Sequence, residues 1–404
     1  MSDVALYVNH KGQPVTHSSY SARQTFKKCP RQFQLERVEG WRDKENRAAP
    51  QFGKCVEAGV QRFEADGRKP GTAVEEFARL WAEVKNLPEF PKFVYTDTEG
   101  SWEQLDRAGR EMMLLYEIRA PFLPISTNPK ALFQQVLRKK LFPGSKYDKL
   151  ENKAVVDILS FPPYNHAMLP EIAPEAADCQ PLHGCNDIPR RSLIIDMKTS
   201  GVDLDTELVM LDPQLAEYAW QARVPDIAFL WFVKKGHEIE KGSRVTLLQD
   251  VGDKHAGYEM ITLLADNDTG TAYVAEMGTF MEYKAAAHNV RGNALKALKA
   301  EWISRPSVYS VPLTGLTKQR LQFGAARITE ADMNEIGRDV AQSTVEMIRA
   351  HEENYYPKLA GIRFPNQKCN FCAMRWLCLN RPKERDENLT RKGEEWLDGE
   401  YDAE

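Results

Sequence analysis

Three features that define distinct classes of protein are missing from this sequence of 404 residues. No apolar run approaches the roughly 20 residues that cross a bilayer, and residues 1–15 lack the apolar core of a signal peptide. The 7 cysteines are too sparse, and odd in number, for the disulfide framework of a secreted protein. The phosphate-binding pattern G-x4-G-K-[S/T] is absent as well. We therefore expect a cytoplasmic protein without membrane association and without a helicase motor of its own.

An excess of charge of one sign is also lacking, since 54 lysines and arginines stand against 58 aspartates and glutamates. This balance excludes a uniformly basic surface for nucleic acid, but it leaves a local basic groove open. A hydrophobic content of 42% excludes a wholly disordered chain. At roughly 150 residues per domain, the length predicts several domains or one core with large insertions.

The sequence begins with helical patterns. Apolar residues recur at helical spacing over 18–40 and 52–65, which predicts two helices in an N-terminal unit of residues 1–65, the first with Cys29 near a turn made by Pro30. The segment 74–120 is rich in Trp and Leu and predicts further helices, within an insertion that spans 66–130.

The period changes in the middle of the chain, where four segments rich in β-branched and aromatic residues predict strands. These segments are 131–142, 154–161, 192–199 and 226–233. An amphipathic helix over 211–222 separates the last two, so residues 131–235 predict an α/β core with a crossover helix. A polar, Pro-rich segment over 162–191 indicates a loop inserted into this core.

The rest of the chain predicts three further units. Residues 236–360 indicate a hairpin near 243–262, a helix over 268–300, and a helix that starts at Thr329 with a capping box and runs to about 352. Residues 361–382 carry three cysteines. The end, 383–404, holds nine acidic and four basic residues, and we expect it to be a solvated tail.

Carboxylates and a lysine stand where the predicted strands lose their apolar character. Asp196 and Lys198 are two residues apart in a strand, so both side chains face the same way. Asp157 interrupts an apolar strand that would neighbour this one, and a buried carboxylate is costly unless a cation satisfies it. Gln214 and Tyr218, at i and i+4 on the crossover helix, would face the same strand ends. Such a set suits phosphodiester hydrolysis with Mg²⁺ or Mn²⁺, although a surface ion pair remains the simpler alternative.

Four cysteines lie at two places far apart in the sequence. Cys369, Cys372 and Cys378 follow the spacing C-x2-C-x5-C, and Cys29 stands about 340 residues upstream. Four thiolates can hold a zinc ion or a [4Fe-4S] cluster. Zinc modules usually draw their ligands locally, but a local zinc knuckle and buried free thiols remain open alternatives. The inserted loop adds three further residues to which the sequence assigns no role: Cys179, His183 and Cys185.

Taken together, the motifs resemble one known family. Ser-Tyr-Ser-x4-Phe-x2-Cys-Pro-x2-Phe (19–33), VVDI, IIDMKTS, QLAEY and C-x2-C-x5-C occur in the order found in RecB-like nucleases of the PD-(D/E)XK superfamily. The sequence is most similar to the iron-sulfur subgroup, which includes AddB-type nuclease domains and CRISPR-associated RecB-like exonucleases. The resemblance implies a restriction-endonuclease-like α/β core with helical insertions and a C-terminal iron-sulfur clasp. The motifs span 19–378, but 66–130 and 235–328 carry none.

The resemblance also implies roles for individual residues. It implies metal ligands at Asp157 and Asp196, a catalytic lysine at Lys198, and the family's Q-x3-Y helix at Gln214 and Tyr218. The subgroup often has a histidine ligand where Glu57 stands here, and a carboxylate is a competent substitute for Mg²⁺ or Mn²⁺. The residues implied to hold a [4Fe-4S] cluster are Cys29, Cys369, Cys372 and Cys378.

Basic residues form local groups that could contact a phosphate backbone. The residues that we assign to DNA contact are Lys27, Lys28, Arg31, Arg138, Lys139 and Lys140.

The resulting hypothesis is a metal-dependent deoxyribonuclease, more an exonuclease than an endonuclease, that serves DNA repair, recombination or phage DNA processing. Its substrate would be single-stranded DNA or duplex ends, and its partner a separate helicase or recombination protein. The alternative is a catalytically weak RecB-like subunit that binds DNA or protein and keeps the cluster for stability. The departure at Glu57 favours this alternative, whereas the intact Asp157, Asp196 and Lys198 disfavour it.

Overall fold

A computed structural model describes residues 5–44, 46–87, 93–96, 99–164, 166–171, 190–234, 244–250, 258–266, 271–277, 320–359 and 367–391. Its centre is a six-stranded mixed sheet with the strand order β14-β10-β9-β8-β3, in which β7 also pairs with β8. The strands are β3 (His17–Ser18), β7 (Leu132–Lys140), β8 (Glu151–Ser160), β9 (Leu193–Ser200), β10 (Asp226–Val233) and β14 (Leu321–Arg327). Strands β9 and β10 are parallel, whereas β7, β8 and β9 pair antiparallel. The four strands predicted for the core are confirmed, and β14 adds an antiparallel edge beside β10.

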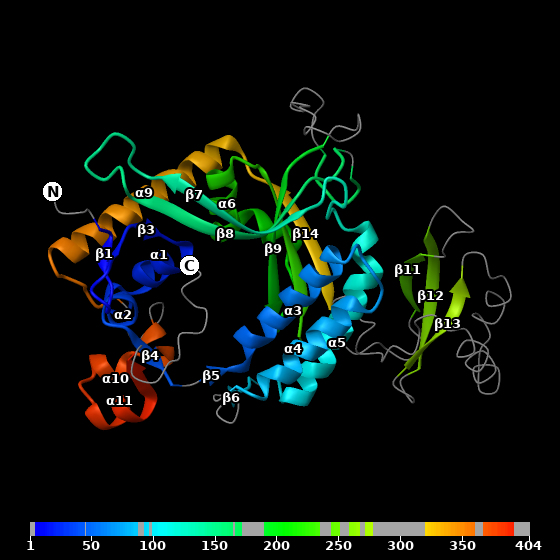
Figure 1. Cartoon of the computed structure of the whole chain (residues 1–404), viewed down its shortest axis with the longest axis horizontal. Helices are drawn as coiled ribbons and strands as arrows, with labels where there is room; N and C mark the ends of the chain where they lie inside the picture. The colour runs from blue at the N-terminus through cyan, green and yellow to red at the C-terminus, as the bar shows by residue number, and fades with distance from the viewer. Residues whose placement is uncertain are drawn as a thin grey trace.

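Helices cover both faces of this sheet (Figure 1). One face carries α3 (Ala48–Ala65), α4 (Thr72–Val84) and α5 (Trp102–Arg119), and the other carries α6 (Pro213–Ala222) and α9 (Glu330–Glu352). Consecutive residues of β9 alternate between the layers, because Ile195 packs into the α3–α5 core and Ile194 packs into the α6 core. The domain is therefore a three-layer α/β/α structure, as expected for the predicted α/β core.

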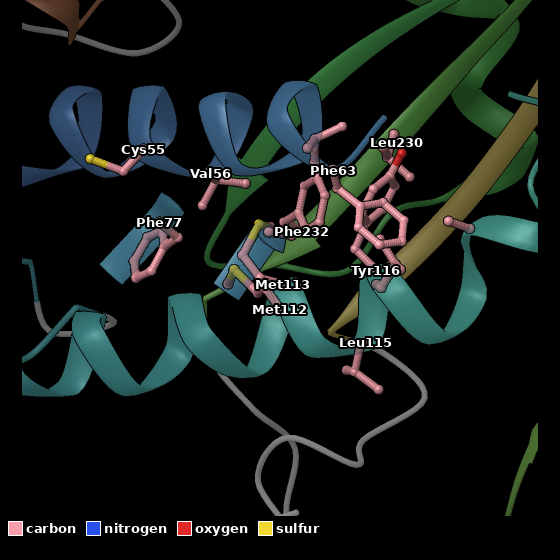
Figure 2. Close-up of a cluster of buried hydrophobic side chains, with 14 of the residues drawn as sticks. Cys55, Val56, Phe63, Phe77, Met112, Met113, Leu115, Tyr116, Leu230 and Phe232 are labelled. Atoms are coloured by element: carbon pink, nitrogen blue, oxygen red, sulfur yellow. The ribbon is translucent and has the colours of Figure 1, made fainter. Parts of the chain in front are cut away.

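The α3–α5 core is built from interleaved side chains of two long helices. Figure 2 shows Val56 and Phe63 of α3 facing Met113 and Tyr116 of α5, with Phe232 of β10 between the two helices. All five side chains are buried, and burying one such side chain stabilises the fold by about 1.5–3 kcal/mol. This packing holds α3 firmly against the sheet, which matters because α3 also borders the candidate site.

The N-terminal helix predicted over 18–40 is broken into three pieces. Helix α1 (Tyr20–Lys28) is capped by Ser19 and ends at Cys29, which is extended at φ −165° and ψ 107°. Helix α2 (Pro30–Phe33) and a five-residue π-helical turn (Gln34–Val38) follow. The break has a steric cause, because Pro30 disfavours a helical conformation in the residue before it. Cys29 is thereby placed at a corner between two helices.

The expectation of a solvated tail is wrong for its first residues, up to Arg391. They form α11 (Pro382–Asn388) and β15 (Leu389–Arg391), and β15 pairs antiparallel with β4 (Trp41–Asp43). Leu389 is only 3% exposed, because it packs with Leu35 and Met374. The acidic composition of the segment gave no sign that Leu389 would be buried against other apolar residues. Residues 392–404 of the predicted tail lie outside the described residues.

The hairpin predicted near 243–262 is confirmed, but the helix predicted over 268–300 is wrong for residues 271–277. Strands β11 (Arg244–Asp250) and β12 (Tyr258–Asp266) confirm the hairpin, but β13 (Thr271–Met277) stands where a helix was expected. The pattern TAYVAEM contains the β-branched and aromatic residues that favour strands. The rest of the expected helix, 278–300, lies outside the described residues.

The remaining elements are short and lie at the edges of the fold. They are β1 (Tyr7–Val8), β2 (Pro14–Val15), β5 (Asn46–Arg47), β6 (Phe93–Val94), α10 (Arg375–Cys378) and the 3-10 turns 120–122, 206–211 and 367–371. Within the part of the chain that the structure describes, no helix is long and apolar enough to cross a membrane.

Candidate active site

Asp196 and Lys198 lie at the end of the buried run of β9. Leu193, Ile194 and Ile195 are fully buried, and Asp196 itself is only 1% exposed. The Asp196 Oδ2 atom lies 2.7 Å from the Lys198 Nζ atom, yet among the described residues it has no hydrogen bond of good geometry. The two side chains face the same way, as the strand period predicted. In this ion pair Asp196 is buried and the Lys198 side chain is 36% exposed, and both residues line one cavity, unlike the surface pair of the simpler alternative.

Asp157 of β8 lies beside this pair, where the two strands separate. The β8–β9 ladder ends at the rung between Ile158 and Ile195. One residue further, the Asp157 Oδ2 atom accepts a hydrogen bond of 2.7 Å from the backbone N–H of Met197. This contact fixes the Asp157 carboxylate against β9, on the same cavity as Asp196.

Helix α6 presents Gln214 and Tyr218 to the lysine. Lys198 Nζ donates to Gln214 Oε1 at 3.2 Å, and Gln214 Nε2 donates to the Tyr218 hydroxyl at 2.5 Å. Asp212 starts the helix by accepting hydrogen bonds from the N–H groups of Gln214 and Leu215 at 3.0 and 2.9 Å. Two turns of α6 thus hold the position of the Lys198 ammonium through side-chain hydrogen bonds.

Glu57 enters the same cavity from α3. Its Oε1 atom accepts a hydrogen bond of 2.8 Å from Gln61 and a further one from Gln134 of β7. The Gln134 amide also lies 3.4 Å from Asp157 Oδ1. The cavity has a volume of about 340 Å³ and is lined by Glu57, Asp157, Asp196, Lys198, Gln214 and Tyr218 among others. The structure therefore brings together all six residues that the sequence assigned to catalysis or divalent-metal binding.

Burial and mutual repulsion change the acidity of these groups. Burial, reinforced by Asp157, raises the pKa of Glu57 to about 7. Burial also raises the pKa of Asp157 and that of Asp196, the latter to about 7 even though Lys198 opposes the shift. For Lys198, burial acts to lower the pKa, but the carboxylates of Asp196, Asp157 and Asp212 together raise it. The lysine therefore stays charged at neutral pH.

The donor chemistry of this cavity fits a hard divalent cation. Carboxylate oxygens are the protein ligands that Mg²⁺ prefers, and the buried Asp196 Oδ2 atom has no well-directed hydrogen bond to any residue that the structure describes. Among the described residues, no group of three or more His, Cys, Asp or Glu side chains is gathered so as to hold a metal ion. Mg²⁺ is commonly held by one or two carboxylates with water and phosphate oxygens as the other ligands, so Asp157 and Asp196 with Glu57 nearby suit it.

The cysteines predicted to act together also line one cavity. Cys29, Cys369, Cys372 and Cys378 border a space of about 370 Å³, where the N-terminal α1–α2 corner meets the segment that follows α9. Burial raises the pKa of both Cys372 and Cys378. The described cysteines are in no disulfide. Four thiols from two distant segments fit the donor set of an iron-sulfur cluster, although here too no group is gathered to hold a metal. Cys179, His183 and Cys185 lie outside the described residues.

The basic residues assigned to DNA contact do not form a single group. Lys27 pairs with Asp339, Arg138 with Glu151 at 3.1 Å, and Lys140 with Asp148 at 2.8 Å. Lys139 points to the other side of β7, where its Nζ atom lies 4.2 Å from the centre of the Trp220 ring. Arg31 pairs with Glu39 at 3.6 Å, and Lys28 lies near Cys372.

Sequence reasoning missed two residues of the site. Asp212 carried a signal, because Asp before Pro at a helix start is typical of an N-cap. Gln134 carried none, since nothing in the sequence separates it from Gln135, whose side chain instead donates to the backbone oxygen of Phe133 at 2.8 Å.

A comparison with protein families matches residues 17–137 to the PD-(D/E)XK nuclease superfamily. The match supports a PD-(D/E)XK nuclease superfamily domain in this chain. The matched segment contains Glu57 and Gln134 but ends before Asp157, Asp196 and Lys198. The mixed α/β architecture with a central sheet is consistent with the PD-(D/E)XK fold. The match suggests nuclease activity that depends on a metal, and PD-(D/E)XK nucleases typically use Mg²⁺ or Mn²⁺.

Comparisons with whole proteins add little to the PD-(D/E)XK match. A solved structure described as "Crystal structure of SSO0001" is 14% identical, and the alignment covers 52% of this chain and 69% of that chain. Its TM-score of 0.18 is too low to carry an argument about fold or function. No curated protein matches the sequence.

Proposed function

We propose that this protein is a Mg²⁺- or Mn²⁺-dependent deoxyribonuclease that hydrolyses phosphodiester bonds at DNA ends. The observation that carries the proposal is the Asp196–Lys198 pair, in which Asp196 is buried beside Asp157 and Lys198 is held by Gln214 in the same cavity. An incidental surface ion pair would need neither the neighbouring Asp157 nor the hydrogen bond to Gln214. The supporting comparison is the superfamily match over 17–137.

Each side chain of the cavity has a distinct task in this proposal. Asp157, Asp196 and Glu57 would hold the divalent cation, which when bound supplies a water of lowered pKa and offsets phosphate charge. Lys198, kept charged by its carboxylate neighbours, donates hydrogen bonds to the oxygens on which negative charge develops. Gln214 and Tyr218 act through Lys198, since their hydrogen-bond chain limits where its ammonium can point.

The proposed activity is tested by digestion of end-labelled linear DNA and covalently closed circular DNA, each single- and double-stranded. We expect linear substrates to be degraded with Mg²⁺ or Mn²⁺, to survive in EDTA, and circular substrates to persist. Degradation of circles at the same rate would replace the exonuclease with an endonuclease. Survival of every substrate, with DNA still bound, would favour the alternative of a non-catalytic subunit.

We further propose that the cavity bordered by Cys29, Cys369, Cys372 and Cys378 holds a [4Fe-4S] cluster that clasps the two distant segments. The position of all four thiols on one cavity supports this proposal. A zinc module would draw its ligands from one short segment, whereas Cys29 comes from the start of the fold.

The cluster proposal predicts a brown protein after anaerobic purification. We expect broad absorbance near 400 nm and about four irons per chain for the intact protein, with most of both lost in Cys378→Ala. Cys55→Ala is the matched control, because Cys55 is also buried but packs in the α3–α5 core, and it should keep the colour. A colourless protein with one bound zinc would contradict the cluster.

A further inference from the structure

The two strands that flank the candidate site change faces at one rung. Two residues apart in a strand normally face the same side of a sheet. Ile158 of β8, however, packs into the α3–α5 core, while Val156 packs into the α6 core. On β7, Phe133 likewise packs against the α3–α5 core and Leu137 against the α6 core. The change of face falls between Phe133 and Leu137 on β7 and between Val156 and Ile158 on β8. Gln134 and Asp157 stand opposite each other at this point.

The backbone of Gln134 explains the switch. Its φ is +50° in the middle of β7, a left-handed conformation that a residue with a side chain adopts at a cost. The register is kept on either side, where Phe133 opposes Ile158 and Gln135 opposes Val156. In both strands the side chains therefore change the face of the sheet to which they point, without the extra residue of a β-bulge. The change occurs at the proposed metal ligand Asp157.

The Gln134 side chain adds a second connection to the same place. Its amide donates to Glu57 Oε1 and lies 3.4 Å from Asp157 Oδ1. Glu57 stands on α3 and Asp157 on β8, and the two carboxylates repel each other. A neutral amide that contacts both oxygens fixes their separation without adding charge.

We propose that Gln134 is a positioning residue that sets the geometry of the Glu57–Asp157 pair for a divalent cation. The proposal rests on the proposed metal-dependent function, and it assigns Gln134 two separable parts. The backbone aims Asp157 into the cavity, and the amide holds Glu57 beside it. Residues that orient metal ligands typically change metal affinity by 10–100-fold when they are replaced.

Two substitutions separate these parts. Gln134→Gly removes the amide but tolerates a positive φ, whereas Gln134→Ala removes the amide and keeps the backbone cost. Titration with Mn²⁺, followed by the electron paramagnetic resonance of the free ion, should give dissociation constants at least about 10-fold higher for both variants than for the wild type. The thermal midpoint of Gln134→Gly should lie above that of Gln134→Ala. Gln135→Ala is the matched control and should bind Mn²⁺ like the wild type.

The outcomes distinguish this proposal from the function on which it rests. If the wild type binds no Mn²⁺, the metal site itself fails. If the wild type binds Mn²⁺ and both Gln134 variants bind within two-fold of it, the positioning role is overturned. Tighter binding by the variants would also overturn it, because the amide would then compete with the cation. A midpoint of Gln134→Ala at or above that of Gln134→Gly would overturn the backbone part alone.

Discussion

Replacing Lys198 with alanine should lower the rate of DNA digestion by roughly 10²–10³-fold, the loss typical of a donor that stabilises transition-state charge. The lysine is the cation paired with the buried Asp196, and Gln214 fixes its direction. The measurement is the single-turnover rate on end-labelled linear DNA with Mg²⁺. The KM, from steady-state digestion of the same DNA, should change less than the rate, since the proposed interaction strengthens only as charge develops.

Two further variants make this result specific. Asp196→Asn should lower the rate of digestion by a similar factor, because it removes a proposed metal ligand while keeping the size of the side chain. Lys69→Ala, which changes an exposed lysine between α3 and α4, should digest DNA at the wild-type rate. Digestion by Lys198→Ala at the wild-type rate would remove the catalytic assignment, provided that its circular dichroism spectrum is unchanged.

Arg23→Met should lower the free energy of unfolding by about 3–5 kcal/mol, because it leaves a buried carboxylate without its partner. Arg23 of α1 and Glu217 of α6 form an ion pair with both side chains almost fully buried. Arg23 also donates to Ser18 and Asn152 at 2.6 Å, and Asn152 donates to Glu217 at 2.9 Å. Urea unfolding followed by tryptophan fluorescence measures the loss.

The double variant Arg23→Met/Glu217→Met tests the stated cause. Replacing a whole buried pair with apolar side chains is often neutral, so the double variant should be more stable than Arg23→Met alone. Arg79→Met is the surface control, because Arg79 pairs with Glu76 and Glu83 on the exposed side of α4, and its urea midpoint should stay near that of the wild type. A double variant less stable than the single one would show that the Arg23 hydrogen bonds, rather than the unpaired charge, dominate.

The sequence sufficed for the parts of the fold that repeat a local period. Strands β8 to β10 and helix α6 follow strand-like or helical patterns, and β8, β9 and α6 carry proposed site residues. The pairing of Asp196 with Lys198 followed from the two-residue period alone. The capping box at Thr329 likewise marked the start of α9, where the Thr329 side chain accepts from the N–H of Asp332.

The rest depended on contacts between distant segments. Leu389 makes β15 a strand only because Leu35 and Met374 provide an apolar surface 15 or more residues away. Gln134 contacts Glu57 across 77 residues, and its left-handed backbone contradicts the alternation that predicted β7 as a regular strand. The pattern of residues within one strand cannot predict the point at which β7 and β8 both change faces, because that change depends on the pairing of the two strands.

The pairing of β4 with β15 has a consequence for synthesis on the ribosome. Trp41 and Cys29 leave the ribosome long before Arg391 and Cys378 do, and at 5–20 residues per second the delay is roughly 20–70 s. During that interval the α1–α2 corner lacks the strand and the cysteines that complete it. Closure of this corner therefore comes late in synthesis, and nascent chains halted before residue 369 should be more easily cleaved by protease near Cys29 than the complete protein.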